Sequence, residues 1–87
     1  MIQDDGEAIR QLRLGNIQGL RILVERYEHR AVHAAHLITL DWASAQDIVQ
    51  DAFVRVYQRI TQFDSSKEFG PWFLRGVVND AIKWTSR

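Results

Sequence analysis

The chain has no cysteine, only one proline and five glycines among its 87 residues. The lack of cysteine excludes disulfide bonds and thiolate metal sites, and it fits a protein from a reducing compartment. Because residues that break helices are few, long helices are possible. A chain of this length can build one domain around one hydrophobic core, but not two.

The chain also has no excess of positive or negative charge and no long apolar run. Eleven Lys and Arg residues balance eleven Asp and Glu residues. This neutrality argues against a protein that grips duplex DNA alone, because phosphate neutralisation supplies most of that affinity. It leaves open a nucleic-acid contact on one face, with help from a partner.

The sequence carries no signal for export or for a membrane. The start, MIQDDGEAIR, is acidic and lacks the apolar segment of a secretory signal. No apolar run approaches the roughly 18 residues that a membrane span needs. We therefore expect a cytoplasmic protein without membrane contact.

Helical periodicity dominates the chain and predicts an all-α fold, a compact bundle of three main helices preceded by a short one. The short helix is expected at about residues 5–14 and the first main helix at about residues 17–38. Gly15 suits the left-handed conformation that ends a helix, and Asn16 can cap the helix that follows. The predicted apolar stripe of this second helix consists of Leu20, Leu23, Val24, Tyr27, Ala31, Ala34 and Ile38.

A third helix is predicted from about Ala45 to Thr61, because Ser44 followed three residues later by Asp47 resembles a capping box. Its apolar spacing predicts a core face made of Val49, Ala52, Phe53, Val56 and Ile60. The opposite face, with Tyr57 on its flank, holds Asp47, Gln50, Asp51, Val54 and Gln58. Either water covers this face, with the acids favoured near the helix N-terminus, or the face docks on a basic partner helix.

Gly70 and Pro71 predict the start of a fourth helix that runs to the end of the chain. Its expected core face consists of Phe73, Leu74, Val77, Val78, Ala81 and Trp84. The opposite face consists of Trp72, Arg75, Gly76, Asn79 and Lys83.

Trp72 is a large ring on a polar face, beside a polar loop. Phe63 and Phe69 are expected to cap the core at the two ends of that loop. One interpretation is that the loop folds over Trp72 and buries it. The other is that Trp72 stacks on an unpaired base, while basic residues of the same face meet phosphates and Asn79 meets a base edge.

Neither a metal centre nor an active site is indicated. His29, His33 and His36 share one side of the second helix and could supply two metal ligands, but a solvated histidine face is the simpler interpretation. The chain has no G-x-S-x-G, P-loop or dinucleotide motif. We therefore expect no enzyme activity, no metal and no cofactor.

Three segments of the chain carry a family pattern, and the first two of them end before residue 64. The segment LRLGNIQGLRILVERYEHR places a small leading helix and a Gly-Asn turn before a long helix. In SAQDIVQDAFVRVYQRITQF, the signature D-x-x-Q-[DE]-x-F is matched by Asp47, Gln50, Asp51 and Phe53.

The third segment is WFLRGVVN, in which Trp72, Leu74, Arg75 and Asn79 match the signature W-x-L-R-x-x-x-N. Each segment alone is a weak signal. In this order and at this spacing, the three together resemble region 2 of bacterial sigma factors, in particular the extracytoplasmic-function (ECF) group of the sigma-70 family.

The resemblance implies that this protein is a transcription initiation domain. The third helix would dock on the clamp helices of the β′ subunit of core RNA polymerase through Asp47, Gln50, Asp51, Val54 and Gln58. The loop between the third and fourth helices would capture a base flipped out of the minus-ten promoter element, and the fourth helix would flank the melted non-template strand. The DNA-contacting residues so implied are Phe63, Asp64, Ser65, Ser66, Lys67, Phe69, Trp72, Arg75, Asn79 and Lys83. An anti-sigma factor is a further expected partner.

The resemblance also sets an expectation for domain organisation. Residues 1–87 would form a single region 2 domain, and the region 4 domain that reads the minus-thirty-five element is absent from this chain. The family commonly continues into more basic residues after the fourth helix, where only Lys83 and Arg87 remain here. The alternative function is a helical adaptor that binds a protein through the third helix and has no DNA role.

Overall fold

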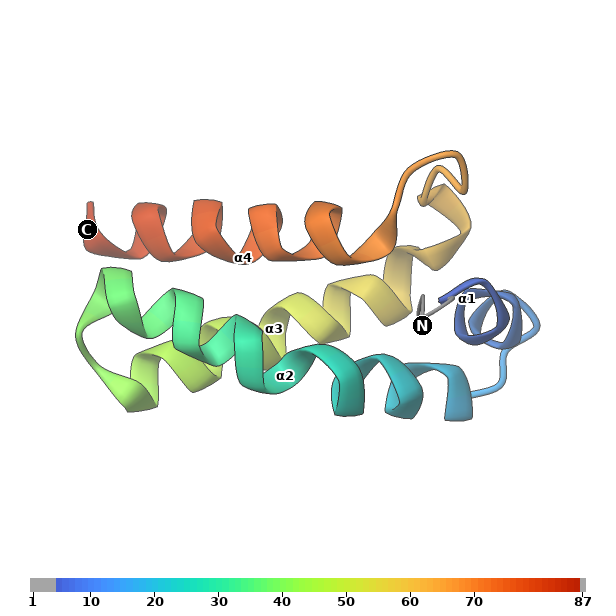
Figure 1. The fold of residues 1–87 in the computed structure, drawn as a ribbon, viewed down its shortest axis with the longest axis horizontal. Coiled ribbons are helices and arrows are strands. Elements are labelled where there is room, and N and C mark those ends of the chain that lie inside the picture. The colour runs from blue at the N-terminus through green and yellow to red at the C-terminus, as the bar shows by residue number, and fades with distance from the viewer. Residues whose placement is uncertain (1–4, 87) are drawn as a thin grey trace.

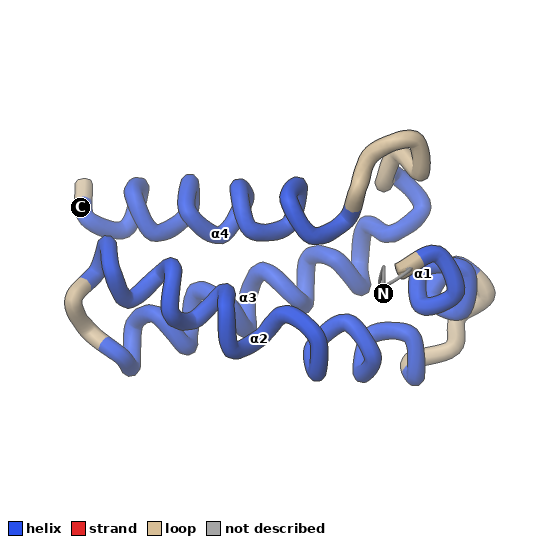
Figure 2. The backbone as a smooth tube through the Cα atoms, in the orientation of Figure 1, coloured by secondary structure: helices blue, strands red, loops and turns tan. Residues whose placement is uncertain are grey.

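The computed structural model describes residues 5–86, and within this range it contains helices and no strand. The elements are α1 (Gly6–Arg13), α2 (Gln18–Thr39), α3 (Trp42–Arg59), the short 3₁₀ turn η1 (Ile60–Gln62) and α4 (Phe69–Thr85). Figures 1 and 2 show α2, α3 and α4 running lengthwise beside one another, with α1 seen end-on near the start of α2. The predicted all-α fold is confirmed.

The core lies between the three long helices and is closed at one end by α1. α2 is the central element, because it contacts α1, α3 and α4. The predicted core face of α3 is buried throughout. On α4, Phe73, Val77 and Ala81 are buried, while Leu74, Val78 and Trp84 are only partly covered.

The predicted stripe of α2 is buried at Leu23, Tyr27 and Ala31, while its members Leu20, Val24 and Ile38 are partly buried and pack against the core. Ala35 is fully buried, whereas Ala34, which was predicted in the core, is only partly covered. The buried positions follow steps of four residues through Leu23, Tyr27 and Ala31. Because α3 and α4 pack on two sides of α2, either alanine could belong to the apolar stripe. The packing of the helices decides that Ala35 is the buried one.

The start of α3 was predicted wrongly. The helix begins at Trp42, with the extended Asp41 before it, so Ser44 lies in the first turn and is not a cap. The Ser44 hydroxyl instead donates a hydrogen bond to Oδ2 of Asp41 over 2.6 Å. α2 and α3 are separated by only two residues because Leu40 is left-handed, with φ of 58°. A leucine rarely adopts this conformation, so the sequence pattern did not indicate the turn.

The turn between α1 and α2 was predicted correctly. Gly15 has φ of 84°, the left-handed conformation expected there. Oδ1 of Asn16 accepts a hydrogen bond from the backbone N–H of Gln18 over 3.0 Å, which caps the start of α2.

Gly19 allows α1 and α2 to cross closely, and replacing it should destabilise the fold. A Cβ atom at this position would lie 2.2 Å from the carbonyl oxygen of Ala8 and 3.0 Å from the backbone nitrogen of Leu12. Because backbone atoms cannot swing aside, we expect Gly19→Ala to lower the free energy of unfolding by about 1–3 kcal/mol, as overpacking does.

Chemical denaturation measures this effect, and Gly76→Ala on α4 is the matched control. No atom lies within 4 Å of a Cβ at position 76, so alanine there should raise stability by about 0.5–1 kcal/mol through its higher helix propensity. Equal stability of the two variants would contradict the close crossing of α1 and α2.

Candidate nucleic-acid interface

A cluster of aromatic rings joins the core to the loop before α4. Phe73 stacks on Phe53 at 4.5 Å and on Phe69 at 5.4 Å between ring centroids, and Phe63 meets Trp72 at 4.9 Å. Phe63 and Phe69 are 7% and 3% exposed, so they cap the core as expected. Trp72 is 42% exposed. The interpretation in which the loop buries Trp72 is therefore wrong, and part of this ring is available to a ligand.

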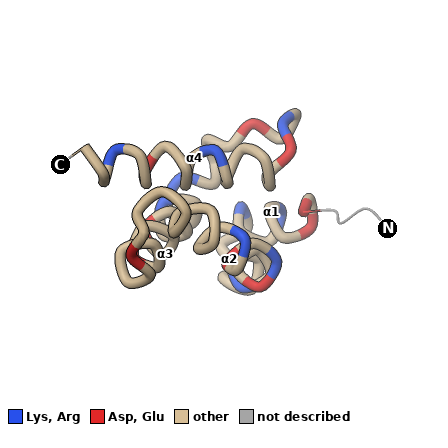
Figure 3. Tube along the Cα trace, turned by 60° about the vertical axis from the view of Figure 1, so that its left-hand side comes forward, with Lys and Arg blue, Asp and Glu red and all other residues tan. Residues whose placement is uncertain are grey.

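Trp72 borders a groove of about 480 Å³ between α3 and α4. The groove is lined by the residues that the sequence placed on the outer face of α4: Arg75, Gly76, Asn79 and Lys83. All four are exposed, which confirms the predicted face of α4. Figure 3 shows basic positions along this helix. The residues that the sequence grouped around Trp72 therefore form one wall of one groove.

The other wall of the groove comes from α3 and was not predicted. It includes Arg55 and Arg59, which are four residues apart and therefore share one side of the helix. Their spacing is visible in the sequence, but nothing in the sequence indicates that this side of α3 faces α4. With Arg75 and Lys83 of α4, the groove has four basic side chains and one acidic one, Asp80.

Among the basic side chains that line the groove, one is in an ion pair and three are not. Arg55 of α3 forms an ion pair with Asp80 of α4, and the two side chains are 45% and 23% exposed. Within residues 5–86, Arg59, Arg75 and Lys83 make no ion pair. The groove therefore offers three uncompensated positive charges beside an exposed indole ring, although the whole chain is neutral.

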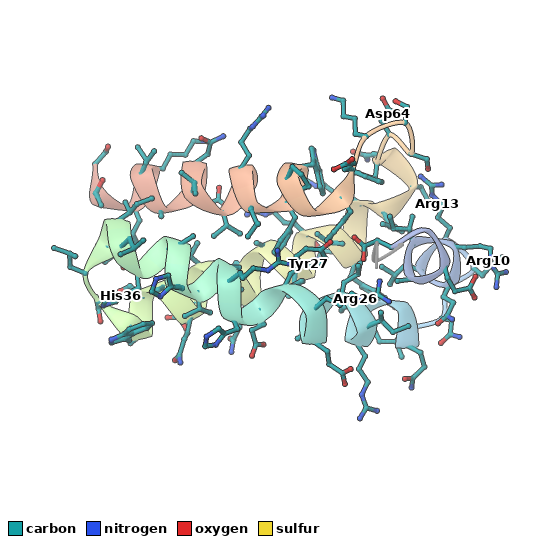
Figure 4. All side chains as sticks on the ribbon, viewed as in Figure 1. Arg10, Arg13, Arg26, Tyr27, His36 and Asp64 are labelled. Atoms are coloured by element: carbon teal, nitrogen blue, oxygen red, sulfur yellow. The ribbon has the colours of Figure 1, made fainter. Side chains whose placement is uncertain are left out.

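The loop before α4 is held in place from within and from α1. Oδ1 of Asp64 accepts hydrogen bonds from the Ser66 hydroxyl over 2.7 Å and from the Ser66 backbone N–H over 2.9 Å. These bonds, the hydroxyl first, lower the pKa of Asp64 below its ordinary value. From α1, the Arg13 guanidinium donates a hydrogen bond to the carbonyl oxygen of Phe63 over 2.7 Å. Arg13 and Asp64 are labelled in Figure 4.

A second hollow, of about 680 Å³, lies on the α1 side of this loop. Its lining combines loop residues with side chains of α1 and with a tyrosine of α2: Ser65, Lys67, Glu68, Arg10, Arg13 and Tyr27. Phe63 lines both this hollow and the α3–α4 groove. The loop is thus positioned between two concave surfaces.

Tyr27, which lines this hollow and is labelled in Figure 4, anchors the residue that precedes α1. Its hydroxyl donates a hydrogen bond to Asp5, whose other carboxylate oxygen accepts one from Arg26 over 2.7 Å. Burial, and then the hydrogen bond to Asp5, raise the pKa of Tyr27 to about 12. The phenol therefore stays protonated at neutral pH and acts as a hydrogen-bond donor that ties α1 to α2.

A separate exposed surface lies on α3, away from the core. The predicted face is exposed at all five positions, namely Asp47, Gln50, Asp51, Val54 and Gln58. Val54 is 50% exposed at its centre, and Tyr57 on its flank is 43% exposed. This face, called the α3 face below, offers one apolar side chain surrounded by groups that accept or donate hydrogen bonds.

The three histidines do not come together as one cluster. His29 and His33 are exposed, whereas His36 is partly buried and stacks on Trp42 with centroids 3.6 Å apart and ring planes 6° apart. Among residues 5–86, no group of three or more His, Cys, Asp or Glu side chains is placed to hold a metal ion.

Membrane insertion through a helix is not supported by the described part of the chain. Neither the length nor the apolar character of any helix within residues 5–86 is enough for it to cross a bilayer.

Comparison with known proteins identifies the fold. A model of the Sigma-70 region 2 family matches residues 23–87. The chain also aligns over 97% of its length with an NMR structure of an engineered region 2 of sigmaE in complex with GTAAAA. That alignment covers 87% of the other chain, with a TM-score of 0.85 and 25% sequence identity.

Curated relatives of the chain are RNA polymerase sigma factors. It is 28% identical over 74 residues to the ECF RNA polymerase sigma factor SigW of Bacillus subtilis, which covers 85% of this chain and 40% of the relative. It is 28% identical over 79 residues to the ECF RNA polymerase sigma-E factor of Escherichia coli K12, which covers 88% and 40%. The RNA polymerase sigma-H factor of Pseudomonas aeruginosa is 25% identical over 79 residues, covering 91% and 41%. The chain spans about two fifths of the length of these relatives.

The fold and the site define an all-α bundle whose third and fourth helices enclose a basic groove beside an aromatic cluster. The chain belongs to the Sigma-70 region 2 family. The resemblance inferred from three sequence segments is thereby confirmed.

Proposed function

We propose that this domain serves transcription initiation by docking on core RNA polymerase and capturing the melted non-template strand of the minus-ten promoter element. The observation that carries the proposal is the position of Trp72. This exposed ring stands at the edge of a groove with three unpaired basic side chains, next to a fixed polar loop. The structural relative in complex with GTAAAA supports a nucleic acid as the ligand.

In this proposal the groove holds the strand by complementary contacts. Trp72 stacks on an unpaired base, which is worth about 1–3 kcal/mol. Arg75 and Lys83 meet phosphates, and Asn79 meets a base edge. No bond is made or broken in this domain, so binding energy alone must repay the cost of extruding a base, about a few kcal/mol.

The loop sets base preference in this proposal, through Asp64, Ser65, Ser66 and Lys67. All four are exposed, and the bonds between Asp64 and Ser66 fix the loop before the ligand arrives. Such preorganisation limits the entropy lost on binding. Phe63 and Phe69 were grouped with the DNA contacts, but both are buried, so we assign them the support of the loop and of Trp72.

The α3 face is the proposed contact with the β′ clamp helices. Val54 supplies an apolar centre, and the carboxylates of Asp47 and Asp51 suit a basic partner helix. An adaptor without a DNA role would use this face alone and would leave the basic groove unexplained. Cytoplasmic location and control by an anti-sigma factor belong to the same proposal, and both rest on family membership.

Exchange of the loop tests the proposed function. Residues 64–68 are replaced by the corresponding loop of another ECF sigma factor, and Phe69 is kept because it is 3% exposed in the core. We expect the preferred minus-ten base to change, with a discrimination of about 1–3 kcal/mol per base. Binding of promoter strands with each base at the flipped position, in complex with core polymerase, measures the preference.

Polymerase affinity is the internal control for this exchange, because the loop lies outside the α3 face. It should stay the same in the loop variant. An unchanged base preference, with polymerase affinity also intact, would show that the loop is only scaffold.

A further inference from the structure

One acidic side chain stands among the basic groups of the α3–α4 groove. Asp80 follows Asn79 on α4, lines the groove and forms an ion pair with Arg55 across it. The pair is the only salt bridge that joins α3 to α4 within residues 5–86. The groove thus contains a carboxylate at a place where the proposed ligand would bring a phosphate.

We propose that Arg55 and Arg59 of α3 form a second phosphate-binding wall for a single-stranded nucleic acid, and that Asp80 occupies Arg55 until a phosphodiester displaces it. This inference rests on the proposed function, because it assigns a further part of the same groove. The inference adds Arg55 and Arg59 of α3 as phosphate contacts, and it makes the Asp80 carboxylate a competitor of the phosphate for Arg55.

The chemistry of the guanidinium group favours such an exchange. An arginine binds a carboxylate and a phosphate in the same way, through parallel N–H donors, so one can replace the other. The Arg55 side chain is 45% exposed, and a pair this accessible contributes little to stability, about 0–1 kcal/mol. The ion pair is therefore weak enough to open for a ligand that brings a phosphate.

The position of the pair gives the exchange a function. Arg59, Arg75 and Lys83 already attract any polyanion, and an unpaired Arg55 would add a fourth charge. With Asp80 present, a strand gains the contact with Arg55 only when one of its phosphates reaches the ion pair that joins α3 to α4. Strands that lie elsewhere on the surface gain nothing from Arg55, so the pair favours strands that are fully seated.

The first test is a set of neutral substitutions in the 87-residue chain. Binding of a labelled oligothymidylate of about ten nucleotides is measured by fluorescence anisotropy from about 50 to 200 mM salt. We expect Asp80→Asn to tighten binding about two- to fivefold, because the strand then no longer has to break an exposed ion pair to reach Arg55. Arg55→Gln and Arg59→Gln should each weaken binding and lower the salt slope by about 0.7.

The pair of Arg21 and Glu25 on α2 supplies matched controls, because it is exposed and lines neither hollow. Glu25→Gln changes the net charge as Asp80→Asn does, and Arg21→Gln changes it as Arg55→Gln does. Both controls should leave affinity and salt slope close to those of the unchanged protein. Effects as large as those of the groove variants would assign the result to net charge and overturn the inference.

The double variant Arg55→Gln/Asp80→Asn separates an ion-pair exchange from simple repulsion by Asp80. If Asp80 acts by holding Arg55, most of the gain from Asp80→Asn disappears once Arg55 is glutamine. A gain of the same size in both backgrounds would overturn the exchange. If Trp72→Ala weakens binding while the Arg55 and Asp80 variants change nothing, the inference fails and the proposed function stands. Absence of strand binding by the unchanged protein, alone and with core polymerase, would overturn both.

Discussion

Replacing Gln50 and Asp51 together by arginine is expected to abolish binding to a purified fragment of the β′ clamp helices. Both side chains are exposed on the α3 face and make no hydrogen bond or ion pair within residues 5–86. The double change reverses the charge of the face towards a basic partner. Loss of one partner in a desolvated charge contact costs about 2–5 kcal/mol, so affinity should fall by a factor of about 30–5,000.

The fold should survive this change, because neither side chain belongs to the core. Circular dichroism should show unchanged helix content and an unchanged melting transition. Gln18→Arg together with Glu28→Arg is a matched control, since it makes the same charge change at exposed positions of α2. Retained affinity in the α3 variant, or an equal loss in the α2 variant, would show that the docking surface lies elsewhere.

Removal of the Phe73 ring is expected to have the largest effect on stability. Phe73 is 3% exposed and packs between Phe53 and Phe69 at the centre of the aromatic cluster. Phe73→Ala should therefore lower the free energy of unfolding by about 3–5 kcal/mol, through lost burial and the cavity left behind. Urea denaturation measures this loss directly.

Trp72→Ala should give the opposite pattern to Phe73→Ala, although the two residues are adjacent. Trp72 is 42% exposed, and its ring lies against Phe63 and Phe69 at the edge of the aromatic cluster, so its loss should cost less stability. It should weaken capture of the single-stranded non-template strand by about 1–3 kcal/mol in the complex with core polymerase. Trp72→Phe should restore part of that affinity, since a smaller ring still stacks. A stability loss as large as that of Phe73→Ala, with normal strand binding, would place Trp72 among the core residues.

Much of the fold followed from periodicity because helix faces are local properties of a sequence. The spacing of apolar residues predicted the buried face of α3 and the exposed position of its five polar-face residues. It also separated Phe73 from Trp72, because neighbouring residues on a helix point about 100° apart. Gly15 and Asn16 marked the turn between α1 and α2, since the conformations of glycine and the capping bonds of asparagine act over one or two residues.

Where one residue had to adopt an uncommon conformation, the sequence pattern was misleading. The left-handed Leu40 let α3 begin at Trp42, ahead of the start predicted from Ser44 and Asp47. The Thr39 side chain exchanges two hydrogen bonds with the backbone of Asp41 across this turn. No local preference of leucine indicates such a turn.

The sequence by itself determined the helical class and the exposed α3 face, which depend on residues less than about two turns apart. It indicated the family through the order and spacing of three segments, and it placed Trp72 on the polar face of α4 while leaving open whether the loop covers the ring. Tertiary structure alone decided how those faces combine. Arg55 reaches Asp80 across 25 residues of sequence, and Arg13 holds the carbonyl of Phe63 across 50. Such contacts depend on how one helix is rotated against another, which the packing of the whole core sets. The groove between α3 and α4 therefore exists only in the folded domain, although each of its walls is a face that the sequence already contains.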